Sequence, residues 1–250
     1  MVKLLAGEER QKVILLGRPS TGCLQNAQPY NAIAIQQYDS LLMDEGYIKF
    51  ETYWKKASPL PKVEIAGLNA YRQRLYEVGL IGAYDNGIGY GNISRRYGAE
   101  EQFIISGSAT GNFPMLTAEH FTLVTKVEAR QNRLWCEGPV VASSESMSHA
   151  AVYQEGPWVN GVIHVHHPGL WKALLHKVPT TDKSAPYGSP EMVASIIHLM
   201  RETRLEEQKI FVMEGHEEGI FTFGHSLEEA FEVLMLYFRA LLRDDISTEF

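Results

Sequence analysis

The residues best suited to chemistry are two histidines at the end of a short apolar segment, Gly161-Val-Ile-His-Val-His166. A β-strand places alternate side chains on the same face, so His164 and His166 would point the same way while the residues between them pack into the core. Two imidazoles that converge in this manner can hold one cation near the end of the strand. His167 is out of phase with the pair and stands outside the predicted site.

Two further residues strengthen this interpretation, because a His-x-His pair alone also occurs among core and surface histidines. His216 lies in a Gly-His-Glu-Glu-Gly turn between two apolar segments, where core packing needs no histidine. Glu145 follows two serines at an expected helix start, where the helix dipole favours a carboxylate. Three histidines, an optional carboxylate and an open position are typical of a catalytic divalent metal. We expect one ion per chain, zinc first, with manganese, cobalt or iron as alternatives.

Such an ion would act as a Lewis acid on a carbonyl or enediolate oxygen. His149 lies one helical turn after Glu145, and we expect it to support the site or pack beside it rather than bind the ion.

Three short polar clusters are candidates for an anion site. They are Gly91-Asn92, Ser106-Gly107-Ser108 and Ser143-Ser144, each at the end of an expected strand or helix. Hydroxyl, amide and free backbone N–H donors at such ends bind phosphate without a lysine. Each cluster alone is more commonly an ordinary turn.

The elements that must position these residues follow from hydrophobic periodicity. Expected strands cover about residues 12–16, 47–54, 103–106, 121–127, 159–166, 210–213 and 219–223. Expected helices cover about residues 30–44, 68–78, 144–154, 190–200 and 226–241. Strands and helices mix without strict alternation, which favours an α/β fold with a mostly antiparallel sheet covered by helices. Two prolines within residues 57–62 mark a seam between a small N-terminal α/β extension, residues 1–62, and a domain of residues 63–250.

Composition narrows the possible partners. The 250 residues carry a formal net charge of −7, without a basic cluster, which argues against nucleic acid. No apolar run approaches the length of a membrane span, and the charged N-terminus does not resemble a signal peptide. Cys23 and Cys136 are expected to be reduced thiols. We therefore expect a cytoplasmic protein that acts on a small molecule.

Five segments together resemble the class II aldolase/adducin family in order and spacing, from about residue 65 to 245. They are Gly89-Tyr-Gly-Asn-Ile-Ser-Arg95, Ile105-Ser-Gly107, Ser143-Ser-Glu-Ser-Met-Ser-His149, Val162-Ile-His-Val-His166, and Gly215-His216 followed by Ser226-Leu-Glu-Glu-Ala230. The resemblance implies a three-layer α/β/α fold, a zinc-type site of three histidines and a homo-oligomer, often a cyclic tetramer.

The resemblance also implies roles for individual residues. Glu145 would be the acid/base and a metal ligand, and Tyr187 would protonate the aldehyde oxygen. The phosphate-binding positions would be Asn92, Ser106, Gly107, Ser143 and Ser144. The implied reaction is that of a metal-dependent aldolase, a lyase that cleaves a hydroxyketone such as a ketose phosphate through a metal-stabilised enediolate.

The chain departs from the family pattern in two places. The family usually has His-Gly at the third histidine, whereas this chain has His216-Glu217-Glu218-Gly219. Two carboxylates there would disfavour an anionic substrate unless they point away, and their simplest interpretation is a solvated turn. Residues 1–62 have no counterpart that we can place.

Other functions remain open at this point. A dehydratase or an epimerase of a sugar phosphate would use the same histidines, although related epimerases typically have aspartate where Glu145 stands. A non-catalytic, adducin-like scaffold would not need the three histidines.

Overall fold

A ten-stranded sheet forms the centre of the computed structural model, which describes residues 2–7, 10–15, 48–98 and 101–247. The strand order is β1-β2-β3-β9-β8-β7-β6-β10-β12-β11. The strands are β1 (Val2–Gly7), β2 (Arg10–Leu15), β3 (Glu51–Lys56), β6 (Asn92–Arg96), β7 (Phe103–Ser106), β8 (Phe121–Glu128), β9 (Arg133–Gly138), β10 (Gly161–His166), β11 (Ile210–Val212) and β12 (Gly219–Gly224). Among these described strands, only β3 and β9 pair in parallel. A separate hairpin joins β4 (Gly82–Ala83) to β5 (Gly89–Tyr90).

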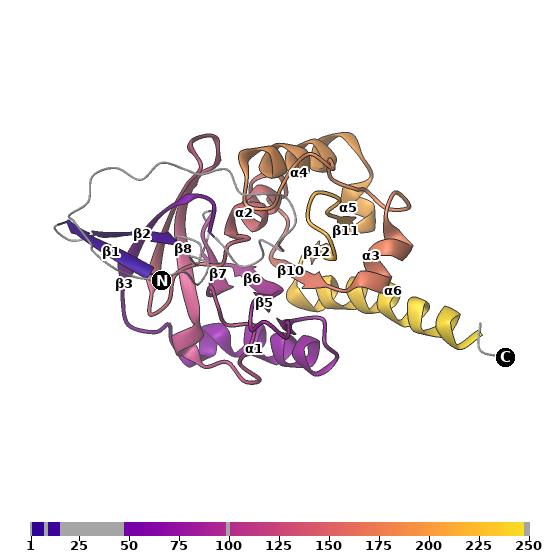
Figure 1. The fold of residues 1–250 in the computed structure, drawn as a ribbon, viewed down its shortest axis with the longest axis horizontal. Coiled ribbons are helices and arrows are strands. Elements are labelled where there is room, and N and C mark those ends of the chain that lie inside the picture. Colours follow the sequence, from indigo (N-terminus) through magenta and orange to yellow (C-terminus); the bar gives the residue numbers. More distant parts are fainter. Residues whose placement is uncertain (1, 8–9, 16–47, 99–100, 248–250) are drawn as a thin grey trace, which may run out of the picture.

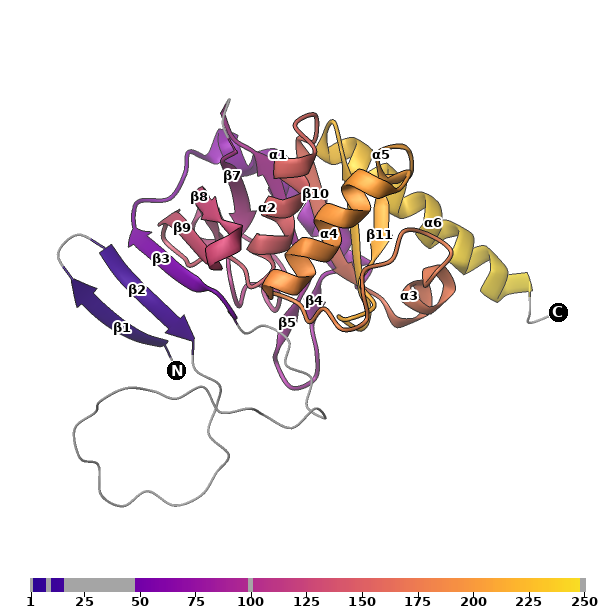
Figure 2. The ribbon, with the colours of Figure 1, turned by 90° about the horizontal axis from the view of Figure 1, so that it is seen from above.

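Helices cover both faces of this sheet, as Figure 1 shows. On one face lie α1 (Lys62–Glu77), α3 (Pro168–Leu174) and α6 (Leu227–Ser247). On the other lie α2 (Ser146–Glu155), α4 (Pro190–Glu202) and α5 (Leu205–Gln208). The view from above in Figure 2 shows α2 and α4 side by side in front of the sheet. The predicted three-layer α/β/α fold with a mostly antiparallel sheet is confirmed.

Two hydrophobic cores explain why the central strands are apolar along their whole length. Phe103 and Ile105 of β7 pack in the core beneath α2 and α4, whereas Ile104 packs in the core beneath α1 and α6. Each such side chain contributes about 1.5–3 kcal/mol when it is fully buried. The same alternation in β10 places Ile163 and Val165 in the α1/α6 core, so its histidines must face α2.

Some elements differ from the expected ones. β1, β6 and β9 were not expected, and α1 begins at Lys62, six residues before the predicted start. The expected helix over residues 30–44 lies outside the described residues. α4 has an N-cap, because the Ser189 hydroxyl accepts the backbone N–H of Met192 at 3.1 Å.

The predicted seam is not visible as a break in the sheet. β3 lies before residues 57–62 but pairs with β9 along its whole length. The division into residues 1–62 and 63–250 therefore stays a prediction.

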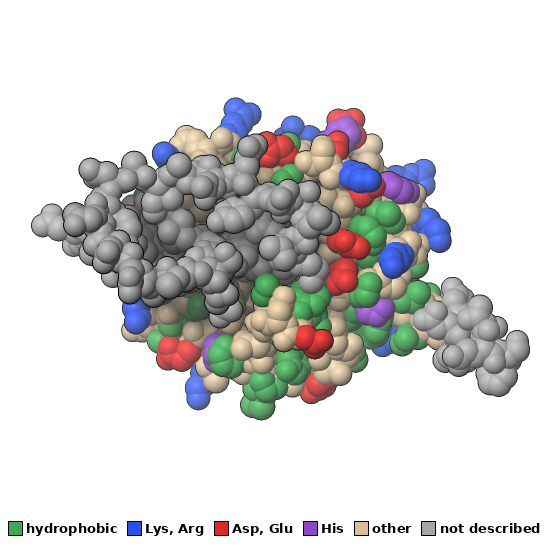
Figure 3. All heavy atoms as spheres, in the orientation of Figure 1, with side chains coloured by type: hydrophobic (Ala, Val, Ile, Leu, Met, Phe, Trp, Pro, Cys, Tyr) green, Lys and Arg blue, Asp and Glu red, His purple; other side chains and the backbone are tan. Residues whose placement is uncertain are grey.

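Three smaller observations bear on the expected partners. None of the helices in the described part of the chain is long and apolar enough to cross a membrane. On the face drawn in Figure 3, lysine and arginine side chains are scattered and form no continuous basic patch among the described residues. Cys136 is a buried free thiol, and burial raises its pKa to about 12. Cys23 lies outside the described residues.

Candidate metal centre

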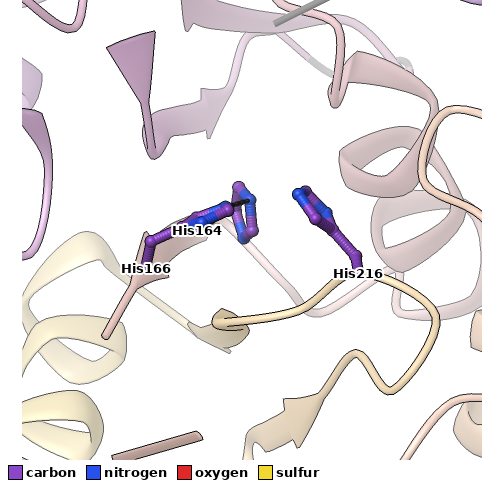
Figure 4. Close-up of side chains that lie close together, drawn as sticks. All are labelled: His164, His166 and His216. Atoms are coloured by element: carbon purple, nitrogen blue, oxygen red, sulfur yellow. Dashed lines mark hydrogen bonds between the residues drawn. The ribbon is translucent and has the colours of Figure 1, made fainter. Parts of the chain in front are cut away.

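Three histidines from two segments point toward one another, as Figure 4 shows. His164 and His166 lie on β10, and His216 lies in the loop between β11 and β12. Each offers a ring nitrogen within 4.8 Å of those of the other two. None of the three side chains is more than 6% exposed. The predicted histidines therefore form one buried cluster consistent with a divalent metal site.

Hydrogen bonds determine which nitrogen each β10 histidine presents to this centre. His164 Nδ1 lies 3.2 Å from the carbonyl oxygen of Ile220, which can only accept, so this nitrogen carries the proton. His166 Nδ1 lies 2.9 Å from the Tyr84 hydroxyl, which donates its own proton to Glu218 at 2.8 Å. His166 Nδ1 must therefore donate to the tyrosine oxygen. Both Nε2 atoms are left with lone pairs, and they lie 3.1 Å apart.

Two lone pairs at this distance repel each other unless a proton or a cation lies between them. Burial lowers the pKa of His164 to about 4, against the opposing charge of Glu145. Burial, aided by the charges of His216 and His164, lowers the pKa of His166 well below its ordinary value. A bridging proton is thus disfavoured near neutral pH. Nitrogen ligands about 2.0–2.1 Å from a tetrahedral zinc ion lie about 3.3 Å apart, so the residues present fit such an ion.

Glu145 places a carboxylate beside the three histidines. It occupies the N-cap of α2, one position before the first helical residue, and is only 1% exposed. Its Oε2 accepts the Ser148 hydroxyl at 2.7 Å, and its Oε1 lies 3.4 Å from His216 Nδ1. Burial alone would raise its pKa, but the hydrogen bond and charge of His216, with His164 and Ser148, lower it to about 2. Glu145 therefore favours its ionised form near neutral pH and lies adjacent to the three histidines.

A buried hydrogen-bond network holds the neighbouring polar residues in place. The His149 Nε2–H donates to Asn92 Oδ1 at 2.6 Å, and the Asn92 amide donates to the Ser143 hydroxyl at 3.0 Å. The other ring nitrogen of His149 lies 2.6 Å from the Ser94 hydroxyl, which also contacts Tyr153 at 2.8 Å. His149 thus supports Asn92 from behind, and protein groups use both of its ring nitrogens.

Four of the five predicted anion-binding residues line one small pocket beside the metal centre. They are Asn92, Gly107, Ser143 and Ser144, joined there by Thr110 and Gly111 among others. Gly107 has no room for a side chain, since a Cβ atom would lie 2.3 Å from Val140 Cγ1. The fifth, Ser106, is not part of this lining, because its hydroxyl accepts the backbone N–H of Ile93 at 3.2 Å.

Arg72 of α1 supports this pocket from behind, and no pattern in the sequence pointed to it. The side chain is only 1% exposed, and its guanidinium donates to the carbonyl oxygens of Thr110, Gly111 and Pro114 at 3.0–3.2 Å. A buried arginine in an amphipathic helix cannot be distinguished by periodicity from an exposed one. The positive charge lies directly behind the loop that lines the pocket.

Tyr187 lies against the metal centre, at 5% exposure, with its ring centroid 4.6 Å from that of His216. The ammonium group of Lys49 lies 3.8 Å above the same tyrosine ring. Lys49 precedes β3, and no spacing or motif in the sequence pointed to it. Tyr187 therefore lies beside the three histidines, and its role in catalysis stays a prediction.

The two glutamates of the His216 loop behave differently from each other. Glu217 is exposed, as a solvated turn requires. The expectation of a fully solvated side chain is wrong for Glu218, because its carboxylate accepts a hydrogen bond from the Tyr84 hydroxyl. Glu218 is thus part of the surroundings of His166 rather than a free surface charge.

Comparisons with known proteins agree with this architecture. The sequence profile described as Class II Aldolase and Adducin N-terminal domain matches residues 82–241. A solved L-fuculose 1-phosphate aldolase has 17% sequence identity and a TM-score of 0.57, covering 76% of this chain and 88% of that chain. The L-fuculose-1-phosphate aldolase from Thermus thermophilus has 22% identity and a TM-score of 0.52, covering 74% and 95%. A sugar-phosphate aldolase from Thermotoga maritima has 18% identity and a TM-score of 0.52, covering 72% and 94%. No curated protein sequence matches the chain.

Structural similarity at these identities shows the fold alone. The profile match, however, spans more than half of the 250 residues, from the hairpin before β6 to α6, and includes all three histidines and Glu145. The chain therefore belongs to the class II aldolase and adducin family.

Proposed function

We propose that the protein is a divalent-metal-dependent aldolase, a lyase that cleaves the carbon–carbon bond of a hydroxyketone. The observation that carries this proposal is the buried cluster of three histidines, in which the Nε2 atoms of His164 and His166 lie 3.1 Å apart and Glu145 lies 3.4 Å from His216. Zinc suits three nitrogen ligands with a position left for substrate, and manganese, cobalt and iron are the alternatives.

A bound divalent ion supplies a Lewis acid that stabilises negative charge on the oxygens of the hydroxyketone. The chain's own residues then move the protons. Glu145, ionised and 3.4 Å from His216, is placed to accept or return a proton at the reacting carbon. Tyr187 can protonate the oxygen of the departing aldehyde. The near-complete burial of the site strengthens these electrostatic interactions.

The substrate class in this proposal is a ketose phosphate. The pocket formed by Asn92, Gly107, Ser143 and Ser144 offers amide, hydroxyl and backbone donors, the groups that bind phosphate. The buried guanidinium of Arg72 adds positive potential behind it. The three similar solved structures described above are named as fuculose phosphate or sugar-phosphate aldolases, which supports the same substrate class.

Metal binding and activity can be tested separately. Elemental analysis should find about one divalent ion per wild-type chain, and His164→Ala should remove it. A panel of ketose phosphates and free hydroxyketones, assayed for aldehyde release with zinc, manganese or cobalt, should identify a cleaved substrate. Glu145→Gln should lower kcat at least about 100-fold, since general acid–base catalysis contributes about 10²–10⁴-fold.

The other outcomes each exclude part of the proposal. A wild-type protein that binds no metal would be a scaffold rather than this enzyme. Loss of water or inversion at a carbon, without aldehyde release, would identify a dehydratase or an epimerase. Unchanged turnover in Glu145→Gln would remove that carboxylate from the mechanism.

The proposal has two further parts, which rest on the sequence and the family resemblance. The first is that the protein forms a homo-oligomer, specifically a tetramer, and the second is that it is located in the cytoplasm. Light scattering tests the first, because a tetramer has four times the 28.2 kDa mass of one chain. A monomeric mass at working concentration would exclude it.

A further inference from the structure

A chain of hydrogen bonds connects the ligand His166 to a carboxylate outside the metal centre. The Tyr84 hydroxyl accepts from His166 Nδ1 at 2.9 Å and donates to Glu218 Oε2 at 2.8 Å. The carboxylate oxygen itself lies 4.0 Å from the ring nitrogen, so the tyrosine bridges the two. The three residues come from three segments: the β4–β5 hairpin, β10 and the His216 loop.

The backbone of Glu218 indicates that its side chain has a specific role. Its φ angle is +69°, in the left-handed region that residues with a Cβ atom disfavour and glycine adopts freely. The family pattern has glycine directly after the third histidine, and here Gly219 follows two residues later than usual. A glutamate in a strained position is typical of a residue whose side-chain contact compensates for the backbone.

Aromatic packing holds the same histidine from a second side. The Tyr84 ring lies edge-on to the His166 ring, with centroids 6.3 Å apart, and packs on Tyr90 at 4.6 Å. Tyr90 in turn lies 5.7 Å from the His166 ring. The β4–β5 hairpin thus fixes the plane of the imidazole, and the hydrogen-bond chain fixes its tautomer.

We propose that Tyr84 and Glu218 are positioning residues for the metal ion, acting through His166. Their hydrogen bonds keep the proton of His166 on Nδ1, leave Nε2 as a lone-pair donor aimed at the centre and increase its electron density. Partners of this kind behind a metal-binding histidine change metal affinity by about 10- to 100-fold. The inference rests on the proposed metal site and adds residues that the three-histidine pattern does not include.

The experiment measures metal affinity rather than turnover. Zinc dissociation constants are determined by competition with a chromophoric chelator, and cobalt absorption spectra report the ligand geometry. Tyr84→Phe and Glu218→Gln should each weaken zinc binding about 10- to 100-fold. Glu217→Gln is the matched control, because it removes the adjacent, exposed carboxylate of the same loop, and its affinity should equal that of the wild type.

A further variant separates positioning from simple structural support. Glu218→Gly removes the carboxylate but suits the left-handed backbone, so the melting temperature of the metal-free protein should hold or rise while zinc affinity falls. A structural role alone would instead lower the melting temperature and leave affinity unchanged.

The possible results distinguish this inference from the proposed function. If the wild type binds zinc and the Tyr84 and Glu218 variants bind it equally well, the positioning role is wrong and the metal site stands. An affinity loss of the same size in Glu217→Gln would also overturn it, since loop charge would then be the cause. If the wild type binds no divalent ion, both proposals fail.

Discussion

His149 shows how a buried titratable group makes this fold sensitive to acid. Burial lowers the pKa of His149 to about 3, with the charge of His164 adding to the effect and that of Glu145 opposing it. In an unfolded chain histidine titrates near about 6.5. Because the folded pKa is the lower one, the unfolded state binds the proton first, and stability is lost as pH falls from about 6.5 towards about 3.

The size of this loss can be measured. Below about pH 6, His149 should lower the free energy of unfolding by up to about 1.4 kcal/mol per pH unit. Urea unfolding of metal-free protein at pH 7, 6 and 5 should show a shallower pH dependence for His149→Gln than for the wild type. The other buried histidines are present in both proteins, so parallel profiles would mean that His149 titrates normally in the fold.

The sequence predicted the positions of individual side chains correctly where the short-range periodicity of a strand determines which face they occupy. His164 and His166 share a face because a strand repeats every two residues. The contact between Tyr84 and Glu218 spans 134 residues and joins two turns whose relative position depends on the whole sheet. No local pattern encodes such a contact, and the left-handed backbone of Glu218 was equally invisible. The family motifs, rather than periodicity, located Tyr187.

At the scale of the elements, α1 contributes more than an apolar face. The Arg72→Leu substitution would remove the guanidinium that donates hydrogen bonds to the carbonyl oxygens of Thr110, Gly111 and Pro114. We expect the free energy of unfolding to fall by at least about 2 kcal/mol, because one hydrogen bond to a charged group contributes about 1.5–3 kcal/mol and three such bonds are lost together. Denaturant unfolding of the variant measures this loss.

Arg74→Leu supplies the comparison for this substitution. Arg74 lies two residues along the same helix, is exposed, and has its guanidinium 4.0 Å from the Phe231 ring in a cation–π contact. Loss of this cation–π contact should lower the free energy of unfolding by about 1 kcal/mol or less. Similar destabilisation by the two substitutions would show that the loop carbonyls do not depend on Arg72.

Element boundaries followed from sequence where apolar runs were continuous. β7, β10, β11 and β12 lie in the sheet between two cores, and their apolar character made them recognisable. β6 begins Asn92-Ile-Ser94 and continues into two arginines, so it looked like a polar loop. Asn92 and Ser94 face the site, so two positions that would be apolar in an ordinary buried strand are polar here.

For the whole molecule, metal binding should appear as added thermal stability. An ion that binds only the folded state at about 100 times its dissociation constant stabilises it by about 2.7 kcal/mol. For a chain of this size we expect the melting temperature to rise by about 5–10 °C. Scanning calorimetry with zinc, and again after a chelator, measures the shift.

Two comparisons sharpen this measurement. His164→Ala should show no shift with zinc, and magnesium should have little effect on the wild type, because it prefers oxygen ligands. An equal rise with magnesium, or in the histidine variant, would place the stabilising ion somewhere other than the three-histidine centre.

The overall architecture was predictable because both the mixed element order and the family motifs pointed to the same three layers. The pairing of β3 with β9 could not be predicted, because the prolines in residues 57–62 suggested a domain boundary after β3. In addition, no local sequence pattern shows with which edge of a sheet a strand will pair. Long-range parallel pairing depends on the edge left open by the rest of the sheet.

The pairing of β6 with β10 has a consequence for the molecules that the site can accept. Asn92 of the pocket lies directly opposite His164 of the metal centre, on adjacent strands whose separation is about 4.8 Å. A ligand that touches both must bring its anionic group within a few bonds of the oxygens that meet the cation. For the proposed ketose phosphate, this register predicts that a substrate whose phosphate lies a few bonds from the metal-binding oxygens binds more tightly than one whose charge lies at the far end of a long carbon chain.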